Sequence, residues 1–172
     1  MAYKVLNNIG LIDTSTNALT SLKTGLLVIV VNKDTNKDSA FKDLNKVSKS
    51  YISKTITSHL KDSGSSILLP KIDGIEAENI MLVKGLDANA PMHKWISSYQ
   101  AIAKKANSIN AKDLSIMSGA ISPSGKDELW LIEMIAKTVE SNVYIFSETK
   151  NKTAKKPSVK KLTIVTTGLK GA

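Results

Sequence analysis

The chain of 172 residues contains no cysteine, which excludes disulfides, thiolate zinc sites and thiol nucleophiles together. This absence favours a reduced, cytosolic setting. The chain also contains no arginine, so all 24 of its basic residues are lysines. Because bidentate contacts to guanine and phosphate depend on arginine, sequence-specific reading of DNA is disfavoured. Residues 1–5 contain no apolar signal core.

The formal net charge is +9, which suggests an acidic partner such as nucleic acid, anionic lipid or the acidic face of a protein. Lysines are most concentrated between Lys150 and Lys161. Two interpretations of this basic balance stay open. The lysines either solvate a loop and a surface, or they support weak, nonspecific binding of nucleic acid.

No apolar run is long enough to cross a membrane, which takes about 20 residues. The longest such run, Leu26–Val31, follows Gly25 and is aliphatic without a break. A half-buried strand alternates apolar with polar residues, so this run predicts a strand covered on both faces. A polar segment and a long amphipathic helix come next, and a buried strand that feeds a helix is the unit of an α/β sheet.

The first helix is expected from about Ser39 to Leu60, with Asp38 or Ser39 as its N-cap and Gly64 in the left-handed turn after it. Its apolar residues recur at spacings of three and four, which predicts one buried stripe. That stripe comprises Phe41, Leu44, Val47, Tyr51, Ile52, Ile56 and Leu60.

Two further helices are expected, one opened by Pro91 and one by Asp127 or Glu128. Trp130 lies off the apolar stripe of the third helix, and we expect it to be partly exposed. The predicted inward residues are Trp95, Ile96, Tyr99, Ile102, Ala103 and Ala106 in the second helix, and Leu129, Ile132, Ile135, Ala136 and Val139 in the third.

Short apolar segments predict the remaining strands, and the segments around 67–69 and 80–83 are joined too closely for a crossover helix. We expect those two to pair antiparallel. Residues 8–24 are expected to form a loop with at most one turn. Further strands are predicted at 1–7, 114–116, 143–146 and 161–165. The fold class is therefore α/β, a single domain over residues 1–172 with a mixed sheet and helices on both faces.

Residue types that carry chemistry are present but do not converge. His59 and His93 lie far apart, and neither resembles a metal ligand. Lys84–Asp87 contains one glycine, which is no dinucleotide fingerprint, and Ser118–Gly125 is a loop that could sit where α/β ligands bind. The carboxylates are scattered over Asp73, Glu76, Glu78, Asp87, Asp113, Asp127, Glu128, Glu133 and Glu140. We therefore assign no catalytic, cofactor-binding or metal-binding residue.

Four segments form a further pattern: Leu26–Val31, Leu44–Ser53, Gly64–Pro70 and Ala77–Leu86. Together they resemble the N-terminal domain of the leucine aminopeptidases, which are cytosolic two-metal exopeptidases. In that family an aliphatic strand precedes a helix with a D-K-A-S-x-G-x-I-S run, then a G-x-x-x-L-L strand and an A-E-R-V-L-L-V-G-L-G strand. Ser50 stands where glycine is usual, Asn79 where arginine is usual, and Lys84 lies within the last motif.

The resemblance implies a macro-like fold that lacks the active site. The family's catalytic domain holds two divalent metals, zinc or manganese, and carries an N-T-D-A-E-G-R motif that an arginine-free chain lacks. The glycine-rich D-S-G-G metal segment is also missing. The resemblance thus implies an inactive N-terminal domain whose partners are its own catalytic domain and the other subunits of a hexamer, with peptide substrates bound elsewhere. Some bacterial members also bind DNA.

Two alternatives to this interpretation stay open. A macro-type module that binds ADP-ribose or a related nucleotide would need a pocket near Gly85, Asp87 and Gly119. A nucleic-acid-binding domain would show binding that falls steeply with salt.

Overall fold

The structure is a computed structural model that describes residues 9–13, 18–119, 121–143 and 158–166. Its strands are β1 Ile9–Asp13, β2 Leu26–Val31, β3 Ser66–Leu69, β4 Ile80–Lys84, β5 Asp113–Met117 and β6 Lys161–Thr166. Its helices are α1 Ser39–Val47, α2 Tyr51–His59, α3 Met92–Ser108 and α4 Glu128–Val143, with 3-10 turns at Leu19–Ser21 and Thr35–Lys37. None of the described helices is long and apolar enough to cross a membrane.

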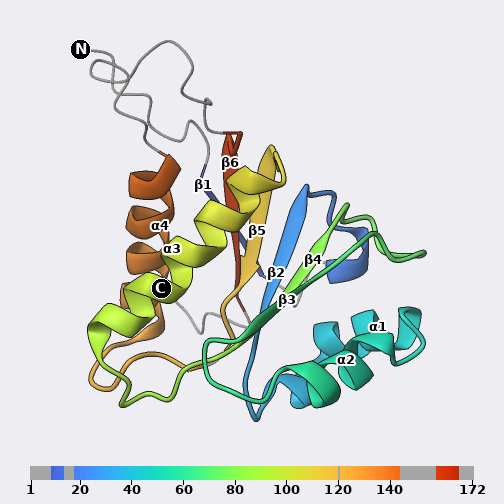
Figure 1. Cartoon of the computed structure of the whole chain (residues 1–172), viewed down its shortest axis with the longest axis horizontal. Helices are drawn as coiled ribbons and strands as arrows, with labels where there is room; N and C mark the ends of the chain where they lie inside the picture. Colours follow the sequence, from blue (N-terminus) through green and yellow to red (C-terminus); the bar gives the residue numbers. More distant parts are fainter. Residues whose placement is uncertain (1–8, 14–17, 120, 144–157, 167–172) are drawn as a thin grey trace.

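One six-stranded sheet runs through the molecule in the order β1-β6-β5-β2-β4-β3 (Figure 1). All neighbours pair parallel except β3, which pairs antiparallel with β4. The mixed sheet and the predicted antiparallel pair are therefore confirmed. The connection between β3 and β4 is too short for a crossover, whereas the parallel neighbours of β2 are reached through helices.

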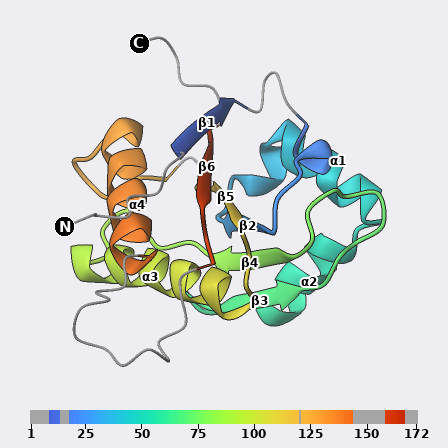
Figure 2. The ribbon, with the colours of Figure 1, turned by 90° about the horizontal axis from the view of Figure 1, so that it is seen from above.

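Strand β2 is buried along its whole length and divides its side chains between two cores. Leu26, Val28 and Val30 pack with α3 and α4, whereas Leu27, Ile29 and Val31 pack with α1 and α2. Successive strand side chains point to opposite faces, so a continuous aliphatic run suits a layer covered on both sides. Figure 2 shows the two helix pairs on opposite faces of the sheet, as predicted.

The predicted helix over residues 39–60 is broken in two, which corrects the prediction of one stripe. Asp38 caps α1 as expected, accepting from the backbone nitrogens of Ala40 at 2.8 Å and Phe41 at 3.1 Å. The break comes at Lys49 and Ser50, whose φ angles of 51° and 63° are left-handed. It turns Val47 and Tyr51 outward, leaving them 38% and 50% exposed. The other five stripe residues are buried or half-buried.

The inward residues of α3 and α4 are largely as predicted. Ile96 of α3 and Ala136 of α4 are half-buried. The prediction that Leu129 points inward is wrong, because this side chain is 57% exposed in the first turn of α4. Trp130 is half-buried, which confirms its predicted partial exposure. The rest of the two predicted sets is buried.

The N-terminal prediction is wrong in part. Residues 8–24 were expected to form a loop, but Ile9–Asp13 is strand β1, which pairs with β6. The short Ile-Gly-Leu-Ile run gains its hydrogen-bond partners from a strand more than 140 residues away, which no local pattern reveals. The predicted strand at 1–7 lies outside the described residues. So does all of the strand predicted at 143–146 except Val143, which ends α4.

Candidate functional site

Three loops meet at the carboxyl ends of β2, β4 and β5, the edge where ligands of parallel α/β sheets commonly bind. The Gly85 nitrogen donates to the Val31 oxygen at 2.8 Å and extends the pairing of β4 with β2. The Ser124 nitrogen donates to the Ala88 oxygen at 2.7 Å and ties the loop after β5 to the loop after β4. The structure thus brings both loops singled out in the sequence to one edge.

Two glycines let these loops lie close to the end of β2. A Cβ on Gly85 would lie 3.1 Å from the Val31 oxygen. Gly119 has a φ of +74°, and a Cβ there would lie 2.6 Å from Nδ2 of Asn32 and 3.3 Å from the Val30 oxygen. The space beside Gly85 and Gly119 is therefore occupied by the Asn32 side chain and by the backbone at the end of β2.

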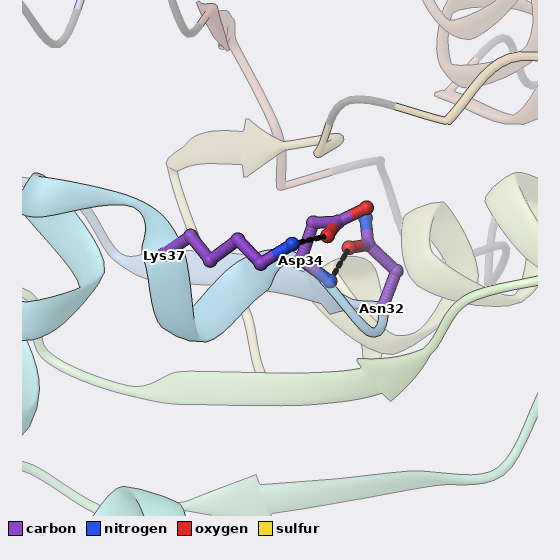
Figure 3. A network of polar contacts seen from close by, with 3 residues as sticks. All are labelled: Asn32, Asp34 and Lys37. Carbon is purple, nitrogen blue, oxygen red and sulfur yellow. Dashed lines mark hydrogen bonds and ion pairs between the residues drawn. The ribbon is translucent and has the colours of Figure 1, made fainter.

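Asn32 is the residue that sequence reasoning missed, although its position directly after the buried strand was a usable signal. Its nitrogen donates to Oγ1 of Thr35 at 2.8 Å, and its Oδ1 accepts from the Asp34 nitrogen at 2.8 Å. Figure 3 shows how this asparagine leads into the turn that carries Asp34 and Lys37. Asn32 therefore shapes the turn with its oxygen while its amide nitrogen faces Gly119.

Asp34 and Lys37 form an exposed ion pair of 2.7 Å beside this turn (Figure 3). The hydrogen bond and the charge of Lys37 lower the pKa of Asp34, and the same contact raises the pKa of Lys37. Each group already has a partner, and exposed pairs of this kind contribute little to stability. The pair supports the turn and provides no unpaired charge for a ligand.

The remaining candidate residues do not come together in the described parts of the chain. His59 ends α2 and His93 lies in the first turn of α3, and both are exposed. Oδ1 of Asp127 accepts from the Trp130 nitrogen at 2.8 Å, which is the role of a helix cap. The described residues contain no group of three or more histidines, aspartates or glutamates that could hold a metal ion.

A shallow hollow on the outer surface of α2 is lined by Ser53, Lys54, Thr57 and Ser58. The hydroxyls of its two serines and its threonine donate to backbone carbonyls of the preceding turn. These groups are occupied within the helix, so the hollow provides no convergent polar set.

Two buried polar side-chain groups lie on the sheet-facing side of α3. Nε1 of Trp95 and the hydroxyl of Tyr99 are buried, and neither has a hydrogen-bond partner among the residues that the structure describes. Burial raises the pKa of Tyr99. The two side chains are four residues apart, which places them on one face of the helix. Both belong to the core shared with α4 and the sheet.

Known proteins share sequence similarity with this chain. Residues 27–153 match the model of the N-terminal domain of the cytosol aminopeptidase family. A probable cytosol aminopeptidase of Pseudomonas fluorescens is 28% identical over 152 residues, which cover 85% of this chain and 30% of that protein. This chain therefore spans about a third of the length of that relative.

Solved structures share the fold. A tomato leucine aminopeptidase mutant matches with a TM-score of 0.70 and 22% identity, covering 98% of this chain and 34% of that one. A Trypanosoma brucei macrodomain, solved in complex with ADP, matches with a TM-score of 0.63 and 13% identity over 96% and 66% of the two chains. The macro-like fold predicted from the sequence is confirmed.

Proposed function

This chain belongs to the cytosol aminopeptidase family through its N-terminal domain, and from that premise we propose that it is the noncatalytic part of a leucyl aminopeptidase. The match over residues 27–153, which runs from β2 past the end of α4, carries the proposal. The parent enzyme would hydrolyse the N-terminal residue from peptides in the cytoplasm. Residues 1–172 would form one domain, with the catalytic domain outside this chain.

The metals of the parent enzyme do not fit the described residues of this chain. A two-metal hydrolase needs a cluster of carboxylate or imidazole ligands, and the described parts of the chain bring no three such groups together. The proposal therefore puts two divalent ions, zinc or manganese, in the catalytic domain and derives no step from them here.

The role that remains for this domain is assembly. We propose that it contacts its own catalytic domain and neighbouring subunits of a hexamer, and that it shapes the access of peptides to active sites elsewhere. Its two exposed apolar positions on α1 and α2, Val47 and Tyr51, support a surface that is covered in the full assembly.

Activity measurements test the proposal directly. The 172-residue chain should release no product from a leucine amide substrate, with or without added manganese or zinc. Robust turnover by the purified chain would overturn it. The reading frame that follows codon 172 is an independent test, because it should encode a cluster of lysine, aspartate and glutamate metal ligands.

A second candidate function is binding of ADP-ribose, favoured by the fold shared with macrodomains, one of which is a Trypanosoma brucei macrodomain in complex with ADP-ribose. Against it stands the close packing of Asn32 on Gly119 at the carboxyl edge. Calorimetry with ADP-ribose separates the two candidates. We expect no heat of binding, and saturable binding in the micromolar range would favour the nucleotide-binding module instead.

A further inference from the structure

Two apolar side chains are exposed where α1 meets α2, on the face of the sheet opposite α3 and α4 (Figure 2). Val47 ends α1 and Tyr51 begins α2. The turn between β3 and β4 adjoins them, because a Cβ on Gly74 would lie 2.7 Å from Cγ1 of Val47. The exposed pair therefore continues onto bare glycine backbone, which leaves room for a partner to approach closely.

The backbone that presents this pair is strained. Lys49 and Ser50, which lie between Val47 and Tyr51, both have left-handed φ angles, which cost free energy in residues other than glycine. The Tyr51 nitrogen donates to the Ser48 oxygen at 3.0 Å and closes the turn. Strained backbone gathers at functional sites, where the surrounding structure maintains it. A function for the outward surface would account for the cost of the break.

Positive charge surrounds the exposed pair. Lys46, Lys49 and Lys54 are exposed and lie within three positions of Val47 or Tyr51, whereas no carboxylate lies that close in the sequence. Within the part of the chain that the structure describes, none of these three lysines forms an ion pair. Asp73 in the adjoining turn is exposed and offsets one of the charges, so a positive excess remains.

The shallow hollow on α2 extends this surface along the helix. Lys54 lines the hollow and is three residues from Tyr51, which puts both on one side of the helix. The hydroxyls in the hollow donate to backbone oxygens of α2. The amine of Lys54 is therefore the group in the hollow that can meet a carboxylate.

We call these neighbours the Tyr51 surface, which comprises Val47, Tyr51, Gly74, Lys46, Lys49 and Lys54. We propose that the Tyr51 surface binds a protein segment in which aspartates and glutamates surround an aliphatic or aromatic side chain. The apolar anchor packs on Val47 and Tyr51, since aromatic side chains contribute strongly to interfaces, and the carboxylates pair with the lysines. This inference rests on the assembly role proposed above and adds the chemistry of the partner.

An anionic membrane fits the Tyr51 surface less well than an acidic protein segment. A helix that binds at a membrane interface inserts a whole apolar face. The apolar faces of α1 and α2 are packed in the core, through Phe41, Leu44 and Ile52, so only Val47 and Tyr51 remain to insert. A partner with one apolar anchor and several carboxylates matches that smaller area.

Synthetic peptides test the proposal on the 172-residue chain. The probe is a short fluorescein-labelled peptide in which glutamates and aspartates surround one tryptophan and one leucine. The reference peptide carries serine in place of both apolar residues. Fluorescence anisotropy should show saturable binding of the probe at low salt, at least about fivefold tighter than binding of the reference peptide. Raising the salt from about 20 to 200 mM should weaken the binding, because it screens exposed charges.

Charge-matched variants test where the peptide binds. Lys46→Gln with Lys54→Gln removes two charges from the Tyr51 surface, and Lys104→Gln with Lys105→Gln removes two exposed charges from α3. The first variant should bind the probe about fivefold or more weakly at low salt, with a smaller dependence on salt. The control should stay within about twofold of the unaltered chain.

A second pair of variants tests the apolar anchor. Val47→Gln with Tyr51→Gln removes the exposed pair, and Met92→Gln with Leu129→Gln removes exposed apolar side chains from α3 and α4. Only the first should weaken binding of the probe, by about fivefold or more. Thermal melts should show that all variants are folded, and the charge variants keep the test valid if an apolar variant is not.

Three results would overturn the proposal. They are equal losses in a variant and its control, no binding of the probe at low salt, and tighter binding to phosphatidylserine vesicles than to the probe. The leucine amide assay does not involve the Tyr51 surface, so the proposed function can stand when this inference fails. Turnover in that assay would instead count against the proposed function, whatever the peptides do.

Discussion

Oδ1 of Asn45 in α1 accepts a hydrogen bond from the backbone nitrogen of Ser53 in α2, at 3.1 Å, across the break between the two helices. The backbone oxygen of Asn45 also accepts from the Ser50 nitrogen at 2.8 Å. One residue of α1 therefore satisfies a backbone donor within the break and another beyond it, in α2. Ser53 lies in the first turn of α2, where backbone nitrogens have no partner within the helix.

Replacement of Asn45 by Ala should lower the free energy of unfolding by about 1 kcal/mol, because the Ser53 nitrogen loses its acceptor. Urea denaturation at 25 °C measures the change. Lys46→Ala is the control, since Lys46 is exposed and neighbours Asn45 in the same helix. It should change stability by less than about 0.5 kcal/mol. Equal effects of the two replacements would show that the side-chain bond across the break contributes nothing.

Ser50 is held in a conformation that favours glycine, with a φ of 63°. Its side chain makes no capping hydrogen bond, so replacement by glycine removes strain without removing a helix cap. Ser50→Gly should raise the free energy of unfolding by about 0.5 to 1 kcal/mol in urea denaturation. Ser58→Gly in the regular part of α2 should do the opposite, by about 0.5 kcal/mol. A loss of stability in both would contradict the strain argument.

This position also explains why the sequence led to one helix where there are two. The apolar residues keep helical spacing through Val47, Tyr51 and Ile52, and no glycine or proline interrupts them. Ser50 stands where glycine is usual in the family. That glycine position was the one sign of a turn that the sequence offered. Helical spacing of apolar residues alone does not reveal such a break, and here it placed Val47 and Tyr51 in the buried stripe although the break leaves both exposed.

The sheet was more predictable at its centre than at its edges. Leu26–Val31 carries its own signal, because burial on both faces requires apolar residues throughout. Strand β1 owes its existence to a partner near the other end of the chain, so local pattern did not reveal it. The arrangement at the carboxyl edge of the sheet was predicted only in part. Gly85 and Gly119 were identified from turn chemistry, but the contact of Asn32 with Gly119 depends on how two parallel strands align.

Tyr99 should make the protein sensitive to alkali. Its buried hydroxyl has no hydrogen-bond partner within the described part of the chain, and burial raises its pKa above the value of about 10 for the unfolded chain. Above pH 10 the unfolded state loses this proton and the folded state keeps it. Stability that is fully present below pH 10 is therefore lost as pH rises, at up to about 1.4 kcal/mol per pH unit from this one group.

Tyr99→Phe should remove that part of the alkaline loss. The free energy of unfolding, measured by urea denaturation between pH 8 and pH 11, should fall less steeply for this variant than for the unaltered protein. At pH 7 the change should be small or stabilising, because an unpaired buried hydroxyl is removed. Tyr51→Phe, at a side chain that is 50% exposed, controls for the titration of the many lysines. Identical alkaline slopes for the two variants would contradict a buried, unpaired Tyr99.

Gly119 and Gly125 differ in surroundings but not in backbone conformation, which makes them a matched pair. Their φ angles are +74° and +76°, yet a Cβ on Gly125 would meet nothing within 4 Å, whereas one on Gly119 would meet Nδ2 of Asn32 at 2.6 Å. Alanine at either position incurs the left-handed strain of about 1 kcal/mol. Only Gly119→Ala must also displace the side chain of Asn32, whose Oδ1 accepts a hydrogen bond in the turn after β2.

Gly119→Ala should therefore lower the free energy of unfolding by at least about 1 kcal/mol more than Gly125→Ala in urea denaturation. Combining it with Asn32→Ala should recover part of the difference, because the shorter side chain leaves room for the new methyl group. Asn32→Ala combined with Gly125→Ala should show additive losses, since those two positions share no contact. If Gly119→Ala and Gly125→Ala cost the same, the carboxyl edge is looser than the structure shows, and the argument against ADP-ribose binding at this edge loses its basis.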